Sequence, residues 1–137
     1  MDSHTSLSKA TARLLPGDPA TRRRHRELRR RIKAADAADD GVELLRLYDG
    51  LTTEEIPRFG IDVLRALLRV DPPAARPVLR QVIEDSGDAW LITFGLERVG
   101  ECGLVELRDV VRTAESDPRR VVASTAVSVG KRLDKGG

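Results

Sequence analysis

One helix ending occurs twice in this sequence, first as RQVIEDS at residues 80–86 and then, with two extra residues, as RDVVRTAES at residues 108–116. Downstream of each copy lies a run in which apolar residues recur at every third or fourth position, at residues 88–101 and 117–133. That spacing places the apolar side chains on one face of a helix. Repetition of this kind predicts pairs of helices stacked on one another.

Capping residues mark the expected helix ends. Asp40 precedes Glu43 by three residues, the spacing of a capping box, and Gly50 can end that helix in a left-handed conformation. Asp88 can cap a later helix, and Asp117, which stands before a proline, can cap the last one. These signals predict one helical domain over residues 7–134, made of a basic N-terminal pair at 7–39 and repeat pairs at 40–71, 73–101 and 103–133, with loose ends at 1–6 and 135–137.

The last of these runs carries a family resemblance. Residues 117–133 read DPRRVVASTAVSVGKRL, in which Arg120-Val121 follows Asp-Pro, and Val129 and Gly130 come eight and nine positions after Val121. This pattern resembles the second helix of a HEAT repeat, and the likeness to HEAT and armadillo-like proteins extends over residues 41–133. The resemblance implies an all-α fold, a short right-handed solenoid of antiparallel helix pairs, with three clear pairs and a fourth at the N-terminus. An irregular helical bundle is the alternative, because the middle pair lacks the Arg after its Asp and the repeat spacing drifts.

The composition agrees with aliphatic packing between helices. Of the 137 residues, 40% are apolar and 34% charged, but only 3% are aromatic. The single cysteine, Cys102, leaves no internal disulfide and favours a reducing compartment. Residues 1–15 lack the apolar core of a secretion signal, and no apolar run has the length of a bilayer span. We therefore expect a cytoplasmic protein without a membrane partner.

A strongly basic helix is expected at residues 21–33, which read TRRRHRELRRRIK, and Asp18, which precedes a proline, can open it. The segment holds eight Arg or Lys and one acid in a chain whose net charge is only +2, so the remainder is acidic. Like charges three or four positions apart destabilise the isolated helix by about 1–3 kcal/mol in total, so it should lie beside anions. Those anions are the protein's own acids, an acidic partner or nucleic-acid phosphates. The candidate anion-binding residues are Arg22, Arg23, Arg26, Arg29, Arg30 and Lys33.

No catalytic or metal-binding constellation is evident in the sequence. His4 and His25 are the only histidines, and the cations around His25 oppose both its protonation and metal binding. Cys102 has no identifiable base nearby and is expected to be a half-buried residue between repeats. We therefore predict neither an enzyme nor a cofactor or metal site.

A candidate binding face begins on the helix expected at residues 56–71. Arg58, Asp62, Arg65 and Arg69 are spaced four, three and four positions apart, which makes a continuous polar stripe on one side of that helix. In HEAT-like arrays the second helices of successive pairs line the concave surface, which is the usual binding face. Shifting the stripe by a local repeat of about 29 residues gives Gly87, Leu91, Phe94 and Arg98.

Two aromatic residues make the middle helix of this face distinctive. Trp90 is the only tryptophan, and Phe94 follows it by one helical turn. Either this pair is buried in the middle repeat, or it is a partly exposed anchor flanked by arginines, the residue types that dominate binding hot spots. We predict a non-catalytic interaction module, an adaptor, scaffold or inhibitor-like protein, whose concave face binds a protein with an acidic and apolar surface. Nucleic-acid binding through the helix at 21–33 is the alternative, although no aromatic lies among its arginines. The predicted partner-binding residues are Arg58, Arg65, Arg69, Trp90, Phe94 and Arg98.

Overall fold

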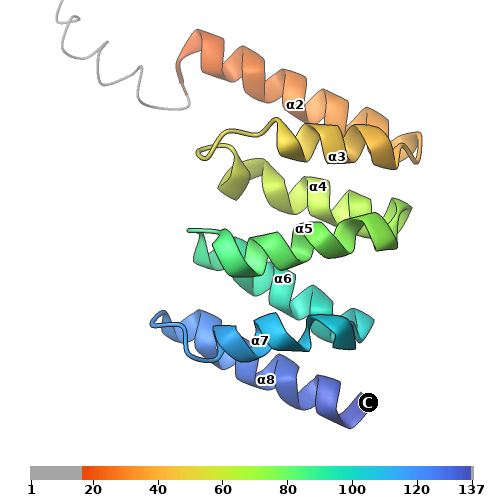
Figure 1. Ribbon diagram of the computed structural model, residues 1–137. Helices are drawn as coiled ribbons and strands as arrows, with labels where there is room; N and C mark the ends of the chain where they lie inside the picture. Colours follow the sequence, from red (N-terminus) through yellow and green to blue (C-terminus); the bar gives the residue numbers. More distant parts are fainter. Residues whose placement is uncertain (1–16, 137) are drawn as a thin grey trace, which may run out of the picture.

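The structure, a computed structural model, describes residues 17–136 of the chain. This part contains seven α-helices, one short 3₁₀ helix and no strand, which confirms the predicted all-α class (Figure 1). The loose start expected at 1–6, the first part of the N-terminal pair expected at 7–39 (residues 7–16) and Gly137 of the expected loose end lie outside the described residues. The helices are α2 (Pro19–Ala37), α3 (Gly41–Asp49), α4 (Ile56–Val70), α5 (Pro72–Asp85), α6 (Ala89–Cys102), the 3₁₀ helix η1 (Val105–Leu107), α7 (Arg108–Ala114) and α8 (Arg120–Gly136).

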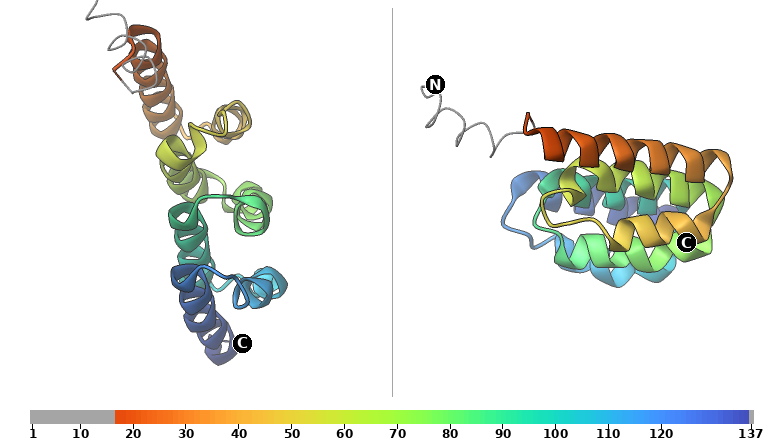
Figure 2. Two further views of the ribbon diagram at one scale, coloured as in Figure 1. Left: turned by 90° about the vertical axis from the view of Figure 1, so that its left-hand side faces the viewer. Right: turned by 90° about the horizontal axis from the view of Figure 1, so that it is seen from above.

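The helices form two layers. One layer contains α2, α4, α6 and α8, and the other contains α3, α5 and α7 (Figure 2). The chain enters α2, α4, α6 and α8 at the same end of the molecule, where the loops after α3, α5 and α7 also lie (Figure 1). Each apolar helix face is thereby turned toward the opposite layer, which removes it from water.

The core lies between the two layers and is almost entirely aliphatic. Leu44, Leu79 and Leu96 are fully buried, and Phe59 is the largest fully buried side chain. The buried positions of α4 recur in α6. The pairs of corresponding residues are Phe59 with Leu91, Val63 with Gly95, and Leu67 with Val99.

Aspartates begin four of the helices by accepting a backbone hydrogen bond from the residue three positions later. Asp18, Asp40 and Asp88 do so at 3.1, 3.1 and 3.0 Å, as the sequence predicted. Asp71 does the same for Ala74, at 3.3 Å, just before the two prolines that open α5. Each cap satisfies a backbone N–H that has no partner within the helix.

The structure corrects several expected helix ends. Gly50 follows α3 with a φ of −86°, so the chain leaves that helix without a left-handed residue. The carboxylate of Asp117 accepts from the backbone N–H of Arg119 at 2.8 Å, and α8 starts at Arg120, later than its proline suggested. Lys135 and Gly136, expected to be loose, continue α8. Cys102, expected to be half-buried, is exposed at the end of α6.

None of the helices within residues 17–136 combines the length and the hydropathy that a membrane crossing requires.

Candidate functional site

Trp90 stands on the outer side of the α2–α4–α6–α8 layer with 75% of its surface exposed. Its position follows from the local sequence, because Asp88 caps α6 and Leu91 and Ile92 enter the core. The residue immediately before them is therefore turned away from the opposite layer. Among the large apolar residues of the described chain, Trp90 is the most exposed. Of the two interpretations of this tryptophan, the structure favours the exposed anchor.

Phe94 behaves differently, although it lies one turn further along α6. Only 9% of its surface is exposed. The guanidinium of Arg98 lies 4.9 Å from the centre of its ring, and that of Arg65 on α4 lies 5.7 Å away. Both distances are in the range of cation–π contacts. Phe94 is thus covered by two arginines and is not a free anchor.

The repeat shift that extended the polar stripe from α4 to α6 was wrong for this face. It placed Leu91 beside Phe94 on the binding surface, whereas Leu91 has no exposed surface. The buried positions define a different register, in which Leu91 corresponds to Phe59 and Trp90 therefore corresponds to Arg58 of α4. Both Trp90 and Arg58 are exposed. The tryptophan thus takes a place that is charged in the neighbouring helix.

Arg69 is held by the end of α2. Its guanidinium forms ion pairs with Asp36 at 2.7 Å and with Asp39 at 2.8 Å. It also donates to the backbone carbonyl of Asp36 at 2.6 Å. These hydrogen bonds, first with Asp36 and then with Asp39, raise the pKa of Arg69 above its ordinary value. Arg69 thus joins α4 to the turn after α2, and a ligand that bound it would have to compete with these contacts.

Arg58 and Arg65 are held more loosely than Arg69. Arg65 contacts Asp62 of its own helix at 3.7 Å, and both side chains are more than half exposed. Arg58 lies 5.8 Å from the ring centre of Phe59, and no carboxylate of residues 17–136 comes within 4.0 Å of it. These two arginines can turn toward a ligand at little cost, because they give up no strong partner within that range.

The basic helix α2 uses two of its arginines to attach to the rest of the protein. Arg24 donates to Glu55 through Nε at 2.9 Å and through Nη2 at 3.1 Å. Arg31 donates to Glu43 through Nη2 at 2.9 Å. His25 packs edge-on against Phe59, with ring centres 5.1 Å apart. Burial, followed by the nearby charge of Arg58, lowers the pKa of His25, so this histidine is neutral at physiological pH.

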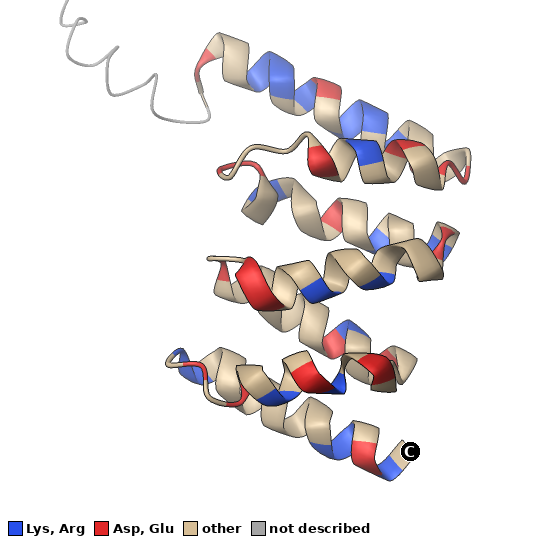
Figure 3. Ribbon diagram, viewed as in Figure 1, with Lys and Arg blue, Asp and Glu red and all other residues tan. Residues whose placement is uncertain are grey.

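Helical spacing places the six candidate anion-binding residues on the side of α2 opposite Arg24 and Arg31. Lys and Arg residues occur along much of this helix (Figure 3). Arg30 pairs with Glu27 of the same helix. No carboxylate within the described range lies within 4.0 Å of the other five, and all of them are exposed. These five exposed cations are Arg22, Arg23, Arg26, Arg29 and Lys33.

A groove of about 720 Å³ runs between α2 and α4 on this face. Its apolar floor includes Ile32 and Ala66, which are 7% and 5% exposed. Arg29 and Lys33 line it from α2, and Arg65 lines it from α4. Asp36 of α2 and Asp62 of α4 also line the groove, so its walls carry both charges with cations in excess.

The residues of the described part include no group of three or more His, Cys, Asp or Glu that could hold a metal ion. Two groups of cations on α2 were not distinguished from the sequence alone. Arg24 and Arg31 attach the helix to the rest of the protein, whereas the five exposed cations do not. A signal for this was present, because Arg24 and Arg31 are seven positions apart, on the side of the helix that also carries Leu28.

No protein-family model, no curated protein and no solved structure matches this chain.

Proposed function

We propose that this chain is a non-catalytic protein-interaction module, a short HEAT-like array whose α2–α4–α6–α8 face binds an acidic partner protein. In this proposal α3–α4, α5–α6 and α7–α8 are antiparallel pairs of a right-handed solenoid, and the binding face is the concave one. Support comes from the two helix layers and from the recurrence of buried positions between α4 and α6. The family resemblance over residues 41–133 points the same way.

The exposed Trp90 is the observation on which the proposal depends. A tryptophan that is 75% exposed leaves a large apolar area in water, although the rest of α6 is well packed. Tryptophan and arginine are among the residues most enriched in binding hot spots. An apolar pocket on a partner that covered this ring would remove that area from water.

The positive charge on the α2–α4 half of this face favours an acidic partner. Arg58 and Arg65 on α4 and the five exposed cations on α2 give one half of the face a positive potential. Such a patch speeds the association of an acidic protein and excludes basic ones. The buried ring of Phe94 helps to position the guanidinium groups of Arg65 and Arg98, which lie over it.

Nucleic-acid binding through α2 is the second candidate, and the five exposed cations of that helix favour it. Each phosphate that they neutralised would release counterions and make the affinity strongly salt-dependent. Against it, residues 21–33 hold no Phe, Tyr or Trp that could stack on bases between these cations.

The test is affinity capture from native lysate with three forms of the protein, each with and without nuclease. Trp90→Ala removes the anchor, and Val42→Ala is the matched control, because Val42 is 67% exposed on α3 in the other layer. We expect specific protein partners that survive nuclease, are retained by Val42→Ala and are lost with Trp90→Ala. If Trp90 is a binding hot spot, its replacement by Ala should weaken binding by at least about 2 kcal/mol. Partners retained by both variants would contradict the proposed face.

A salt titration separates the second candidate from the first. The probe is a fluorescent single strand and a duplex of arbitrary sequence, and the variant is Arg26→Glu with Arg29→Glu. Weak binding that disappears near physiological salt is the expected result for a protein-binding face. Sub-micromolar binding that persists there and is abolished by the double variant would establish the nucleic-acid alternative instead.

A further inference from the structure

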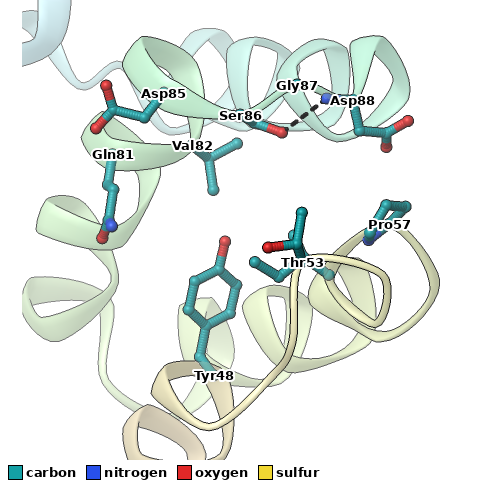
Figure 4. Close-up of a pocket in the computed structure, with 10 residues that line it drawn as sticks. Tyr48, Thr53, Pro57, Gln81, Val82, Asp85, Ser86, Gly87 and Asp88 are labelled. Carbon is teal, nitrogen blue, oxygen red and sulfur yellow. Dashed lines mark hydrogen bonds between the residues drawn. The ribbon is translucent and has the colours of Figure 1, made fainter.

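A second concavity, of about 510 Å³, lies at the end of the molecule where α4 and α6 begin. It is lined from one side by the end of α3 and the loop before α4, and from the other by the end of α5 and the loop before α6 (Figure 4). None of the residues predicted or proposed above for partner binding lines it. Its volume is in the range of small-ligand sites.

Tyr48 supplies a polar group that nothing in the described chain satisfies. The residue is only 8% exposed, and its hydroxyl points into the cavity (Figure 4). The hydroxyl makes no hydrogen bond with any residue of 17–136. Burial, with a smaller effect of Asp49, raises the pKa of this phenol, so the hydroxyl keeps its proton at neutral pH. The hydroxyl is therefore free to bond to a ligand that enters the cavity, at the expense only of water.

Two carboxylates flank the cavity, Asp85 from α5 and Asp88 from the next loop (Figure 4). Neither forms an ion pair within 4.0 Å with the described chain. Asp85 is the last residue of α5, whose final turn contains no base, and a negative charge at a helix C-terminus is unfavourable. Arg119 is paired with Asp117 at 2.9 Å and also donates to the backbone carbonyl of Gly87, at the edge of the cavity, at 3.2 Å. No Lys or Arg of the described residues lines the cavity.

The remaining wall is apolar. Val82, which is 2% exposed, points into the space between the two sides, and Ile56 and Pro57 complete that surface (Figure 4). A ligand that combines an aliphatic body with a positive charge would match both the apolar wall and the two aspartates. We propose that this cavity binds a protonated primary amine on a short aliphatic chain, either a free small molecule or the lysine side chain of a bound protein. The ammonium donates to the oxygen of Tyr48 and is attracted by the charges of Asp85 and Asp88, while its methylene groups pack against Val82 and Ile56.

The test is a titration of the full chain followed by amide chemical shifts. The probes are 1,4-diaminobutane, N-acetyl-lysine methylamide and, as an uncharged control of similar shape, n-butanol. We expect saturable shifts at Thr53 and at residues 85–88 with at least one amine and none with n-butanol. Binding of the diamine alone identifies a free small molecule, and binding of the lysine derivative identifies a side chain. If neither amine gives a saturable shift below about 10 mM, or if n-butanol binds equally well, the proposal is wrong.

Three variants test the roles of the individual groups. Asp88→Asn keeps a capping side chain for α6 but removes the charge, Asp85→Asn removes the other charge, and Tyr48→Phe removes only the hydroxyl. Each should weaken amine binding about tenfold. Glu84→Gln is the matched control, because this acid lies in the same turn as Asp85 but outside the cavity lining, and its binding should be unchanged. Tyr48→Phe should leave thermal stability unchanged or higher, which separates lost binding from lost folding. Wild-type affinity in both Tyr48→Phe and Asp85→Asn would overturn the assignment.

Discussion

Helices α2 and α6 belong to the same layer but are attached in opposite ways. The 19 residues of α2 bury only Leu28, Ile32 and Ala35, and the helix relies on ion pairs from Arg24 and Arg31. The shorter α6, with 14 residues, buries seven of them. The basic helix is therefore attached by a narrow apolar stripe supplemented by ion pairs, whereas packing alone attaches the apolar one. The exposed arginines of α2 and the exposed tryptophan of α6 therefore call for different explanations. Exposed arginines are ordinary on a charged helix, but an exposed tryptophan is unusual on a helix that is otherwise packed.

The largest expected effect comes from the packed helix. Leu96→Ala should lower the free energy of unfolding by about 2–5 kcal/mol, because Leu96 has no exposed surface and its loss leaves a cavity. Chemical denaturation measures this, with Val127→Ala, which is 39% exposed on α8, as a control expected to change less than about 0.5 kcal/mol.

Amide hydrogen exchange shows whether a substitution in α6 and one in α2 destabilise different parts of the protein. Leu96→Ala should speed exchange in helices on both sides of α6, whereas Leu28→Ala should speed it mainly in α2. Equal effects throughout the chain from both substitutions would show that α2 is as central to the fold as α6.

An intermediate effect is expected where α2 joins α4. Glu55 is only 8% exposed and accepts hydrogen bonds from Arg24 and from the backbone of Thr52. Glu55→Gln should lower the free energy of unfolding by about 1–2 kcal/mol at neutral pH, since Arg24 loses its charged partner but is partly exposed. Denaturation at several pH values gives the measurement.

The pH dependence of that loss has a definite sign. The hydrogen bonds from Arg24 lower the pKa of Glu55 below its ordinary value of 4.5 and outweigh the burial that would raise it. A carboxyl whose pKa is lowered by folding stabilises the protein fully above its unfolded pKa and ceases to do so as the pH falls through the lower, folded pKa. The difference between the wild type and Glu55→Gln should therefore shrink below about pH 4.5. A difference that grew in acid would contradict the ion pair.

The smallest effect is expected on the outer side of α2. Arg26 has like charges three and four positions away on both sides, so Arg26→Gln should raise the Tm by about 1–3 °C at low salt. Because salt screens these repulsions, the gain should vanish at high ionic strength. A loss of stability at low salt would mean that Arg26 has an anionic partner within the protein.

Local signals in the sequence were enough to predict the helices but not the contacts that each helix makes with the others. The caps at Asp18, Asp40 and Asp88 depend on residues three positions away, and all three were predicted. The cover over Phe94, in contrast, depends on Arg65, a residue of another helix.

Local signals in the sequence also could not predict which residues of neighbouring helices correspond to one another. The interval read from the sequence could not place Phe94 correctly, because the interval that relates Phe59 of α4 to Leu91 of α6 is longer. The partners of Arg24 and Arg69 likewise lie in other elements, 31 and 33 residues away. Contacts of this kind depend on how the layers pack, which no short stretch of sequence specifies.

The most direct measurement of the central claim is collisional quenching of Trp90, because this single tryptophan is the only source of indole emission in the chain. With acrylamide as a neutral quencher, we predict a quenching constant close to that of N-acetyltryptophanamide in the folded protein, together with an unchanged Tm for Trp90→Ala. That result would establish an exposed aromatic anchor on a stable helical face. A shielded emission, or unfolding of Trp90→Ala, would show that Trp90 belongs to the core, and the proposed binding face would then be wrong.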